Sequence, residues 1–504
     1  MLALLLFASI SAANVKAHID FLASDVLEGR ETGSRGYNVA AEYVASEFEA
    51  LGLEHSFQPV RFRTAMVDGA NCSMRLNDQT FAHKKEVIFR PDFTRTTSDA
   101  EGDVVFVGFG LRNDYATMDV HGKIVAMLSG APPNLPSDRR AFYSDSLRKL
   151  QLAASRGAIG VMTIPTRTDS KRFPWEKAVS QPDMRGMRTL EGDQVDDVVP
   201  EIRASVGLGP AAAAALFAHA PVTLDTVLDD AEKSISHSFP TNVHVSIHTA
   251  TTHGSAESEN VIGVLRGSTK PDEYVVYTAH LDHLGIRSGG TDEDHIYNGA
   301  LDNASGDAAL IEIARAFAAL PQRPARSIAF VAVTGEEKGE LGSNYFAAHP
   351  TVNHVVANIN MDMFTMLFPV GDVIALGAEH STLGDYVADA AKRSGFTVSP
   401  DPLPEEVRFI RSDQYSFVKH GIPAITFKAG SKSLDPAVDG DKVTREWLRN
   451  VYHSVHDNPD QKLDYASGAR WADLNFYLGL AVANAPDAPQ WKPNDFFGTM
   501  FGKR

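Results

Sequence analysis

The sequence of 504 residues has a single cysteine, Cys72, and far fewer basic than acidic side chains. One thiol cannot form an intramolecular disulfide, and it excludes metal sites built from several thiolates. With 47 basic and 64 acidic residues the formal net charge is −17. This charge argues against binding to nucleic acid or to anionic membrane surfaces, so we expect no nucleic-acid partner.

Long hydrophobic runs are also lacking. Residues 1–13, MLALLLFASISAA, are apolar and then small, but the stretch is too short to span a bilayer. Ser11 and Ala13 have the spacing of a signal-peptidase site, although the basic start of a signal peptide is missing. We predict a signal peptide with a truncated or misassigned start, and hence a periplasmic or secreted protein without membrane insertion after cleavage. A buried N-terminal helix is the alternative.

The length favours two domains over a single core. Hydrophobic residues make up 43% and charged residues 22% of the chain, as in a globular protein. After residue 13 the pattern of apolar and polar stretches divides the chain into four parts. These are an N-terminal part at 14–99, a β-rich block with few helices at 100–233, an α/β part at 234–490 and a tail at 491–504.

The α/β part alternates apolar strands with amphipathic helices, which is typical of a sheet covered by helices. A glycine-rich stretch at 25–36 separates two helical patterns near the N-terminus, the second at 37–51. We expect an α/β fold with a mostly parallel central sheet and helices on both faces. Its strands are predicted at 261–267, 274–279, 327–333, 355–361 and 424–427, and its helices at 306–320 and 470–485.

Two adjacent acids, Glu336 and Glu337, come directly after the strand at 327–333. In open α/β sheets ligands bind beyond the carboxyl ends of strands, so this pair is placed for chemistry. One carboxylate can bind a metal while its neighbour transfers protons. The alternative is a solvated acidic turn at the start of a helix, where the helix dipole favours Glu.

Four more polar residues follow strands or lie in loops of the same half: His280, Asp302, Asp362 and His453. Nitrogen and oxygen ligands without sulfur suit zinc or another divalent first-row metal. If one Glu transfers protons, five ligands remain, which is more than one four-coordinate catalytic metal needs. They suffice for two metals if one carboxylate bridges. Each residue alone has a structural alternative, such as capping a helix.

Five motifs in order along the chain resemble the di-zinc exopeptidase family of secreted bacterial and fungal aminopeptidases: HLDHLG, NGALDNASG, TGEEKGELGS, NMDMF and YHSVHDNPD. The resemblance extends to LASDVLEGRETGSRGY near the N-terminus and covers most of the chain after residue 13. The block at 100–233, with GDVVFVGFG and AASRGAIGVMTI, is similar to the protease-associated domain inserted into many members. Glutamate carboxypeptidase and glutaminyl cyclase share the fold.

The resemblance implies two zinc ions per chain. By the family pattern His280 and Asp362 would hold one zinc and Glu337 and His453 the other, with Asp302 bridging them.

The resemblance also implies roles in catalysis. Glu336 would be the general base toward the attacking water. Asp282 would accept a hydrogen bond from the far nitrogen of His280 and so fix its tautomer. Tyr415 could donate to the oxyanion of the tetrahedral intermediate. Two nearby histidines receive no role and are expected to be structural: His283 and His456.

The function implied is a zinc-dependent exopeptidase acting on peptides, with an aminopeptidase as the first choice. A carboxypeptidase or dipeptidase of the same fold is the nearest alternative. A cyclase is disfavoured because it would need one zinc, whereas five ligands are present. A non-catalytic, receptor-like binding protein would be expected to lose ligands, and none of the five is lost. No oligomeric state is predicted.

Overall fold

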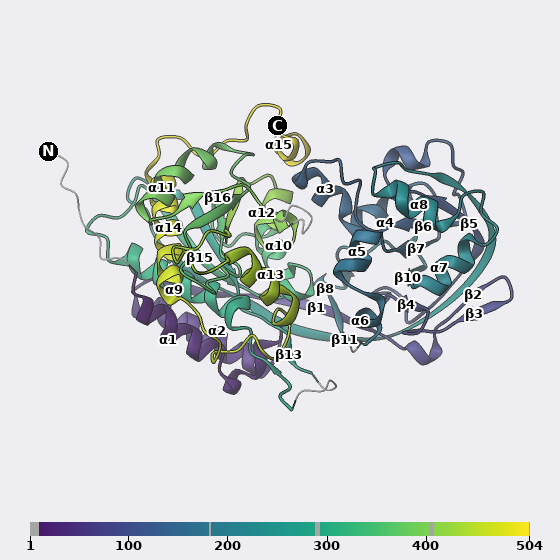
Figure 1. Ribbon diagram of the computed structural model, residues 1–504. Helices are drawn as coiled ribbons and strands as arrows, with labels where there is room; N and C mark the ends of the chain where they lie inside the picture. The colour runs from purple at the N-terminus through teal and green to yellow at the C-terminus, as the bar shows by residue number, and fades with distance from the viewer. Residues whose placement is uncertain (1–9, 181–182, 288–292, 403–407, 503–504) are drawn as a thin grey trace. The chain divides into compact units, whose positions relative to one another are not determined.

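The chain forms two compact units in the computed structural model (Figure 1). Unit 1 combines the N-terminal residues up to Val60 with the residues from Glu257 onward, and unit 2 is built from Arg61–Ala256. No helix in the described part of the chain is long and apolar enough to cross a membrane. The structure describes residues 10–180, 183–287, 293–402 and 408–502.

Unit 1 is built on a mixed, mostly parallel sheet. Its strands are the C-terminal end of β11 (Ser238–Leu265), β12 (Lys270–His280), β15 (Arg326–Val333), β16 (His354–Asn360), β17 (Asp372–Leu376), β18 (Thr397–Val398) and β19 (Ala424–Ala429). The order across the sheet is β11, β15, β12, β16, β19, β17, β18. Strands β15, β12, β16 and β19 run parallel, whereas β11 and β17 pair antiparallel with β15 and β19.

Burial explains why these segments are strands. All eight residues of β15 are buried, as expected for an uninterrupted apolar run in a parallel sheet covered on both faces. The structure confirms the predicted strands, with one difference at 261–267. That segment is only the end of β11, which begins at Ser238 because its earlier residues alternate between buried and exposed and pair with β5 (Thr97–Val107).

Helices cover both faces of this sheet (Figure 1). On one face the ring of Phe330 in β15 packs against Phe48 and Phe317. On the other face Phe346 and Phe417 pack together, with ring centroids 6.1 Å apart. The predicted α/β architecture is therefore confirmed. The first face carries α1 (Ala12–Leu22), α2 (Arg35–Ala50), α9 (Ser305–Ala318) and α14 (Tyr465–Asn484), and the second carries α10 (Leu341–Ala348) and α12 (Gln414–Lys419).

The predicted signal peptide lies partly outside the described residues, because nothing before Ile10 is described. The main-chain N–H of Ile10 donates to Asp473 Oδ1 at 3.1 Å. The Ser11 side chain caps α1 by accepting from the N–H of Asn14. Export therefore stays a prediction.

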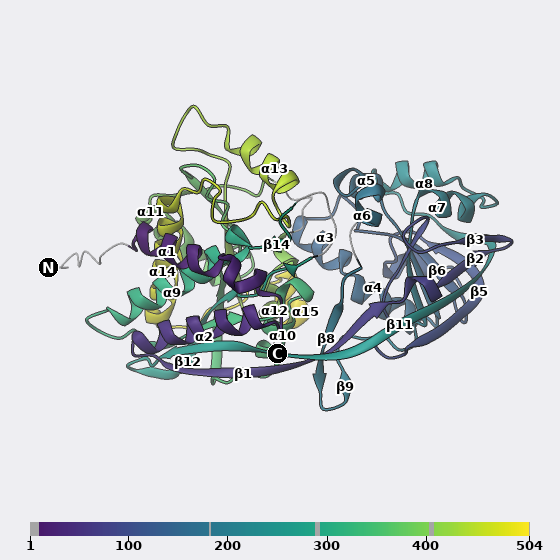
Figure 2. The same cartoon turned by 90° about the horizontal axis from the view of Figure 1, so that it is seen from below.

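Unit 2 contains the block expected at 100–233 and extends beyond it in the sequence at both ends. The flanking strands explain the difference, because β1 (Glu54–Val67) pairs with β8 and β11 pairs with β5. Within the unit β5, β6, β7 and β10 run parallel. Figure 2 shows the long strands β1 and β11, which pair with each other. Its remaining strands are β2 (Ser73–Leu76), β3 (Gln79–Phe81), β4 (Val87–Phe89), β6 (Ile124–Leu128), β7 (Gly160–Ile164), β8 (Gly186–Glu191), β9 (Gln194–Val195) and β10 (Ala204–Leu208).

The expectation of few helices in this block was wrong. Six helices, each six to ten residues long, lie in the described part of the segment from Ser137 to Ala231. Helices this short complete too few turns to give a clear apolar period in the sequence. They are α3 (Ser137–Ser144), α4 (Ser146–Ser155), α5 (Arg167–Arg172), α6 (Trp175–Ser180), α7 (Pro210–Phe217) and α8 (Leu224–Ala231).

Candidate metal centre

The predicted ligands gather at one edge of the unit 1 sheet. Because β12, β15 and β16 are adjacent and parallel, the residues that follow them meet at their carboxyl ends. His280 ends β12, the Glu336–Glu337 pair follows β15, and Asp362 follows β16. Asp302 lies in the turn before α9 and His453 in the loop after α13 (Gly440–Asn450).

Asp302 occupies the centre of this cluster. Its Oδ1 lies 3.2 Å from His280 Nε2, and its Oδ2 lies 3.1 Å from His453 Nε2. Asp362 Oδ1 lies 3.6 Å from the same nitrogen of His280, and Glu337 Oε2 lies 3.3 Å from His453 Nε2. The two oxygens of one carboxylate therefore face two separate histidines, which is the arrangement that a bridging ligand requires.

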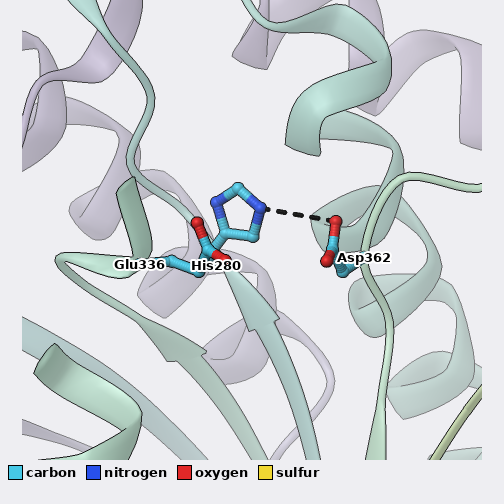
Figure 3. A group of neighbouring side chains, drawn as sticks. All are labelled: His280, Glu336 and Asp362. Carbon is cyan, nitrogen blue, oxygen red and sulfur yellow. Dashed lines mark ion pairs between the residues drawn. The ribbon is translucent and has the colours of Figure 1, made fainter. Parts of the chain in front are cut away.

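The donor set fits divalent metal ions. All donors are imidazole nitrogens or carboxylate oxygens, the ligands that zinc takes in the absence of thiolates. In the view of Figure 3 the His280 ring lies between the carboxyl groups of Glu336 and Asp362. Two groups of three side chains bring one ligand atom from every member to within 4.8 Å of the others: His280, Glu336 and Asp362, and His283, Asp302 and Glu337.

These groups differ from the predicted ligand sets: Asp302 belongs to the second group only, and His453 belongs to neither. Glu336, expected to transfer protons, joins the first group, and His283, expected to be structural, joins the second. His453 still contacts two members of the cluster, and 36% of its side chain is exposed. The side chains of Asp302 and Glu337 are only 5% exposed, so the cluster opens to solvent on the side of His453.

Burial and charge push the pKa values of the two adjacent acids apart. Burial raises the pKa of Glu336 well above its ordinary value, and the nearby charge of Glu337 adds to the effect. Burial also raises the pKa of Glu337, but the charge of His453 and a hydrogen bond from His283 lower it below the ordinary value. Neighbouring carboxylates with opposite shifts are typical of a site that divides proton transfer from ion binding.

The histidines respond to the same charges. Burial alone would lower the pKa of His280, but Glu336, Asp302 and Asp362 together raise it well above its ordinary value. Burial likewise opposes protonation of His453, whose pKa the carboxylates of Glu337 and Asp302 raise to about 10. The carboxylates thus create a negative field that favours a cation in their midst, as expected of a metal centre.

Asp282 contacts the site differently from the prediction. Its carboxylate accepts from the main-chain N–H groups of Glu336 at 3.1 Å and Glu337 at 3.3 Å, and from the Thr32 hydroxyl at 2.9 Å. The far nitrogen of His280, Nδ1, lies 3.1 Å from the main-chain carbonyl oxygen of Asp282 instead. The Asp282 carboxylate points toward Glu336 and Glu337 because the main-chain N–H groups of these two residues donate to it.

Asp457, four residues after His453, forms hydrogen bonds with the turn that carries Asp302. Its Oδ1 accepts from the N–H of Leu301 at 2.9 Å, and its Oδ2 accepts from the N–H of Asp302 at 3.0 Å. These bonds join the His453 loop to the turn before α9. This role was not predicted from the sequence, although Asp457 lies within the YHSVHDNPD motif.

Arg30 holds the same region from the N-terminal segment. The side chain is fully buried. It donates to the carbonyl oxygens of Leu281 at 3.0 Å, Asn298 at 2.6 Å and Gly299 at 3.1 Å, and also to that of Leu22. The glycine-rich stretch at 25–36 thus fixes the loops that carry His280 and Asp302.

Lys428 in β19 orients Asp362. Its ammonium group lies 3.0 Å from Asp362 Oδ2, while Oδ1 of the same carboxylate faces His280. Burial raises the pKa of Asp362, but the charges of Lys428 and His280 lower it to about 2. Asp362 therefore stays ionised with one oxygen directed at the cluster.

Two tyrosines lie in different surroundings. Tyr415 is 2% exposed, and its ring packs near Phe409 and Phe497. Tyr452 stacks on His453, with ring centroids 3.9 Å apart. The oxyanion role of Tyr415 stays a prediction, and Tyr452 is the tyrosine that contacts a cluster residue. His456, expected to be structural, is exposed.

The segment that carries the cluster matches a known protein family. Residues 260–479 match the family model described as peptidase family M28. This segment contains all the residues of the candidate metal site, from His280 to His453. It confirms, for this part of the chain, the resemblance predicted from the motifs.

Two curated relatives bear different activities in their names. An aminopeptidase NAALADL1 of Mus musculus is 33% identical over 133 residues, which cover 25% of this chain and 16% of the relative. A probable glutamate carboxypeptidase LAMP1 of Arabidopsis thaliana is 24% identical over 484 residues, which cover 89% of this chain and 63% of the relative. Each match spans less than two thirds of the relative's own length.

The fold has a solved counterpart. The structure of an aminopeptidase from Aneurinibacillus sp. strain AM-1 is similar with a TM-score of 0.58 and 20% identity, and the alignment covers 97% of this chain and 98% of that one. At this identity the similarity establishes the fold alone.

Proposed function

We propose that this chain, whose residues 260–479 match peptidase family M28, is a zinc-dependent exopeptidase that removes residues from the amino end of peptides. The observation that carries the proposal is the position of Asp302, which turns one oxygen to His280 and the other to His453. A carboxylate shared between two histidine-containing positions supports a two-metal hydrolytic site.

Five residues would hold the two ions. His280 and Asp362 would bind one, Glu337 and His453 the other, and Asp302 both. Bound zinc ions would lower the pKa of a water molecule and polarise the carbonyl group of the scissile peptide bond. Four further side chains keep the ligand-bearing turns and the Asp362 carboxylate in place: those of Asp282, Asp457, Arg30 and Lys428.

Glu336 would transfer the proton. Its side chain is partly buried, and burial raises the pKa of its carboxyl group well above the ordinary value, as is common for groups that exchange protons in catalysis. As the water oxygen bonds to the peptide carbon, Glu336 accepts a proton from the water. It then gives this proton to the leaving amine as the carbon–nitrogen bond breaks, which balances the hydrolysis.

A carboxypeptidase is the second candidate, since one of the two relatives carries that activity in its name. A receptor-like binding protein is less consistent with the site, because all five predicted ligands are retained. We also propose that unit 2 is a protease-associated domain and that the protein is exported, on the strength of the sequence motifs and of residues 1–13.

A substrate screen distinguishes these candidates. Amino-acid amides and dipeptides, each with a free or an N-acetylated amino end, are incubated with the zinc-loaded protein. We expect cleavage of the free-amine substrates only, because an aminopeptidase must recognise the amino group. Cleavage of N-acetylated dipeptides would instead establish a carboxypeptidase, and no cleavage of any substrate would favour the binding protein.

A further inference from the structure

His283 is a fully buried imidazole to which the proposed mechanism gives no part. It lies three residues after His280, and its side chain is 0% exposed. Its Nδ1 lies 2.7 Å from Glu337 Oε1. Among the residues that the structure describes, its Nε2 has no hydrogen-bond partner. The ring therefore makes one polar contact, and that contact is with a metal ligand.

The surroundings hold the His283 ring in one orientation. Its main-chain N–H donates to the carbonyl oxygen of Arg30 at 3.1 Å. Its ring packs edge-on against that of His453, with centroids 5.8 Å apart and an interplanar angle of 72°. An ionised carboxylate accepts hydrogen bonds but cannot donate them, so the short contact with Glu337 requires a hydrogen on Nδ1.

This hydrogen bond leaves Glu337 with unequal oxygens. Oε1 accepts from His283, while Oε2 faces His453 Nε2 at 3.3 Å. The hydrogen bond uses one of the two lone-pair sites of Oε1 and fixes the orientation of the carboxylate, which favours metal binding through Oε2. Partners that hydrogen-bond to metal ligands orient them and tune the affinity for the ion.

We propose that His283 is a positioning residue that restricts Glu337 to binding zinc through Oε2 alone. The inference rests on the proposed two-zinc function, but it concerns a histidine for which the motif resemblance gives no role. The geometry also places His283 with Asp302 and Glu337 in one group of possible ligands, so direct ligation is the competing role. The two roles predict different zinc affinities for a substitution that keeps the donor nitrogen but removes the ring.

A pair of isosteric substitutions separates the roles. Asparagine carries its amide nitrogen at the same branch position as imidazole Nδ1, whereas leucine has the same shape without a donor. In the full chain, His283→Leu should weaken the affinity for one of the two zinc ions by about 10–100-fold. His283→Asn should stay within about threefold of the unsubstituted protein, because a retained donor preserves most of the effect. Competition with a chromophoric chelator measures both ions separately.

The other outcomes contradict the proposal. If both substitutions weaken zinc binding equally, or if neither variant folds, His283 is a packing residue. Loss of one ion from both variants at every zinc concentration would make it a ligand. Failure of the proposed function looks different, because the unsubstituted protein itself would then not bind two ions. In a Glu337→Gln background the difference between leucine and asparagine should disappear.

Discussion

Glu336→Gln is expected to keep both zinc ions and to lower kcat by about 10²–10⁴, the usual contribution of general acid–base catalysis. The amide has the shape of the carboxyl group but cannot take up the proton of the attacking water. The main-chain N–H of Glu336 still donates to Asp282 in the variant, so the turn should not move. Metal content and kcat are measured on the same preparation.

Glu337→Gln is the matched control on the adjacent residue. It replaces an anionic ligand with a neutral amide, so zinc affinity and activity should fall together. If Glu336→Gln loses metal while Glu337→Gln keeps it, the two roles are reversed, as the grouping of Glu336 with His280 and Asp362 would allow. If both variants keep metal and activity, the turn is a solvated acidic surface.

Asp302→Asn is expected to reduce the zinc content from about two ions to one or fewer per chain and to abolish measurable activity. An amide offers one oxygen, so it can serve the position beside His280 or the one beside His453, but not both. Metal analysis after equilibration in equal zinc concentrations gives the stoichiometry.

Asp362→Asn provides the comparison for Asp302→Asn, because Asp362 contacts only one of the two histidines. It should weaken one ion and leave the other in place. Equal zinc loss in the two variants would mean that Asp302 does not bridge. Full retention of two ions by Asp302→Asn would have the same consequence.

Much of the fold could be predicted because strong local signals agree with the tertiary structure. The apolar run at 327–333 has no polar interruption, and such a run is stable only in a sheet that is covered on both faces. The meeting of His280, Asp362 and the Glu336–Glu337 pair followed from the same logic, since residues after parallel strands meet at one edge. Asp302 and His453 lie in loops, and only the motif resemblance implied their roles.

The parts that the sequence did not reveal depend on contacts between distant segments. Arg30 binds carbonyl oxygens more than 250 residues away, and no local pattern indicates such partners. The position of the Asp282 carboxylate depends on which N–H groups the acidic turn leaves free. Among the short helices of unit 2, α4, α7 and α8 pack against its strands, and local periodicity does not report such packing.

The role of His283 illustrates the same limit. A histidine after a strand is most often a packing residue, and its neighbours in the sequence do not change that expectation. Only the folded chain brings Nδ1 within 2.7 Å of Glu337, which is 54 positions further along.

Metal titration of the chelated protein tests the central claim, a two-ion site bridged by Asp302, most directly. Zinc is added back in steps while bound metal and peptidase activity are followed together. We expect binding to saturate near two zinc ions per chain, with full activity only as the second ion binds. Saturation at one ion with full activity would contradict the bridging role of Asp302 and the two-metal account.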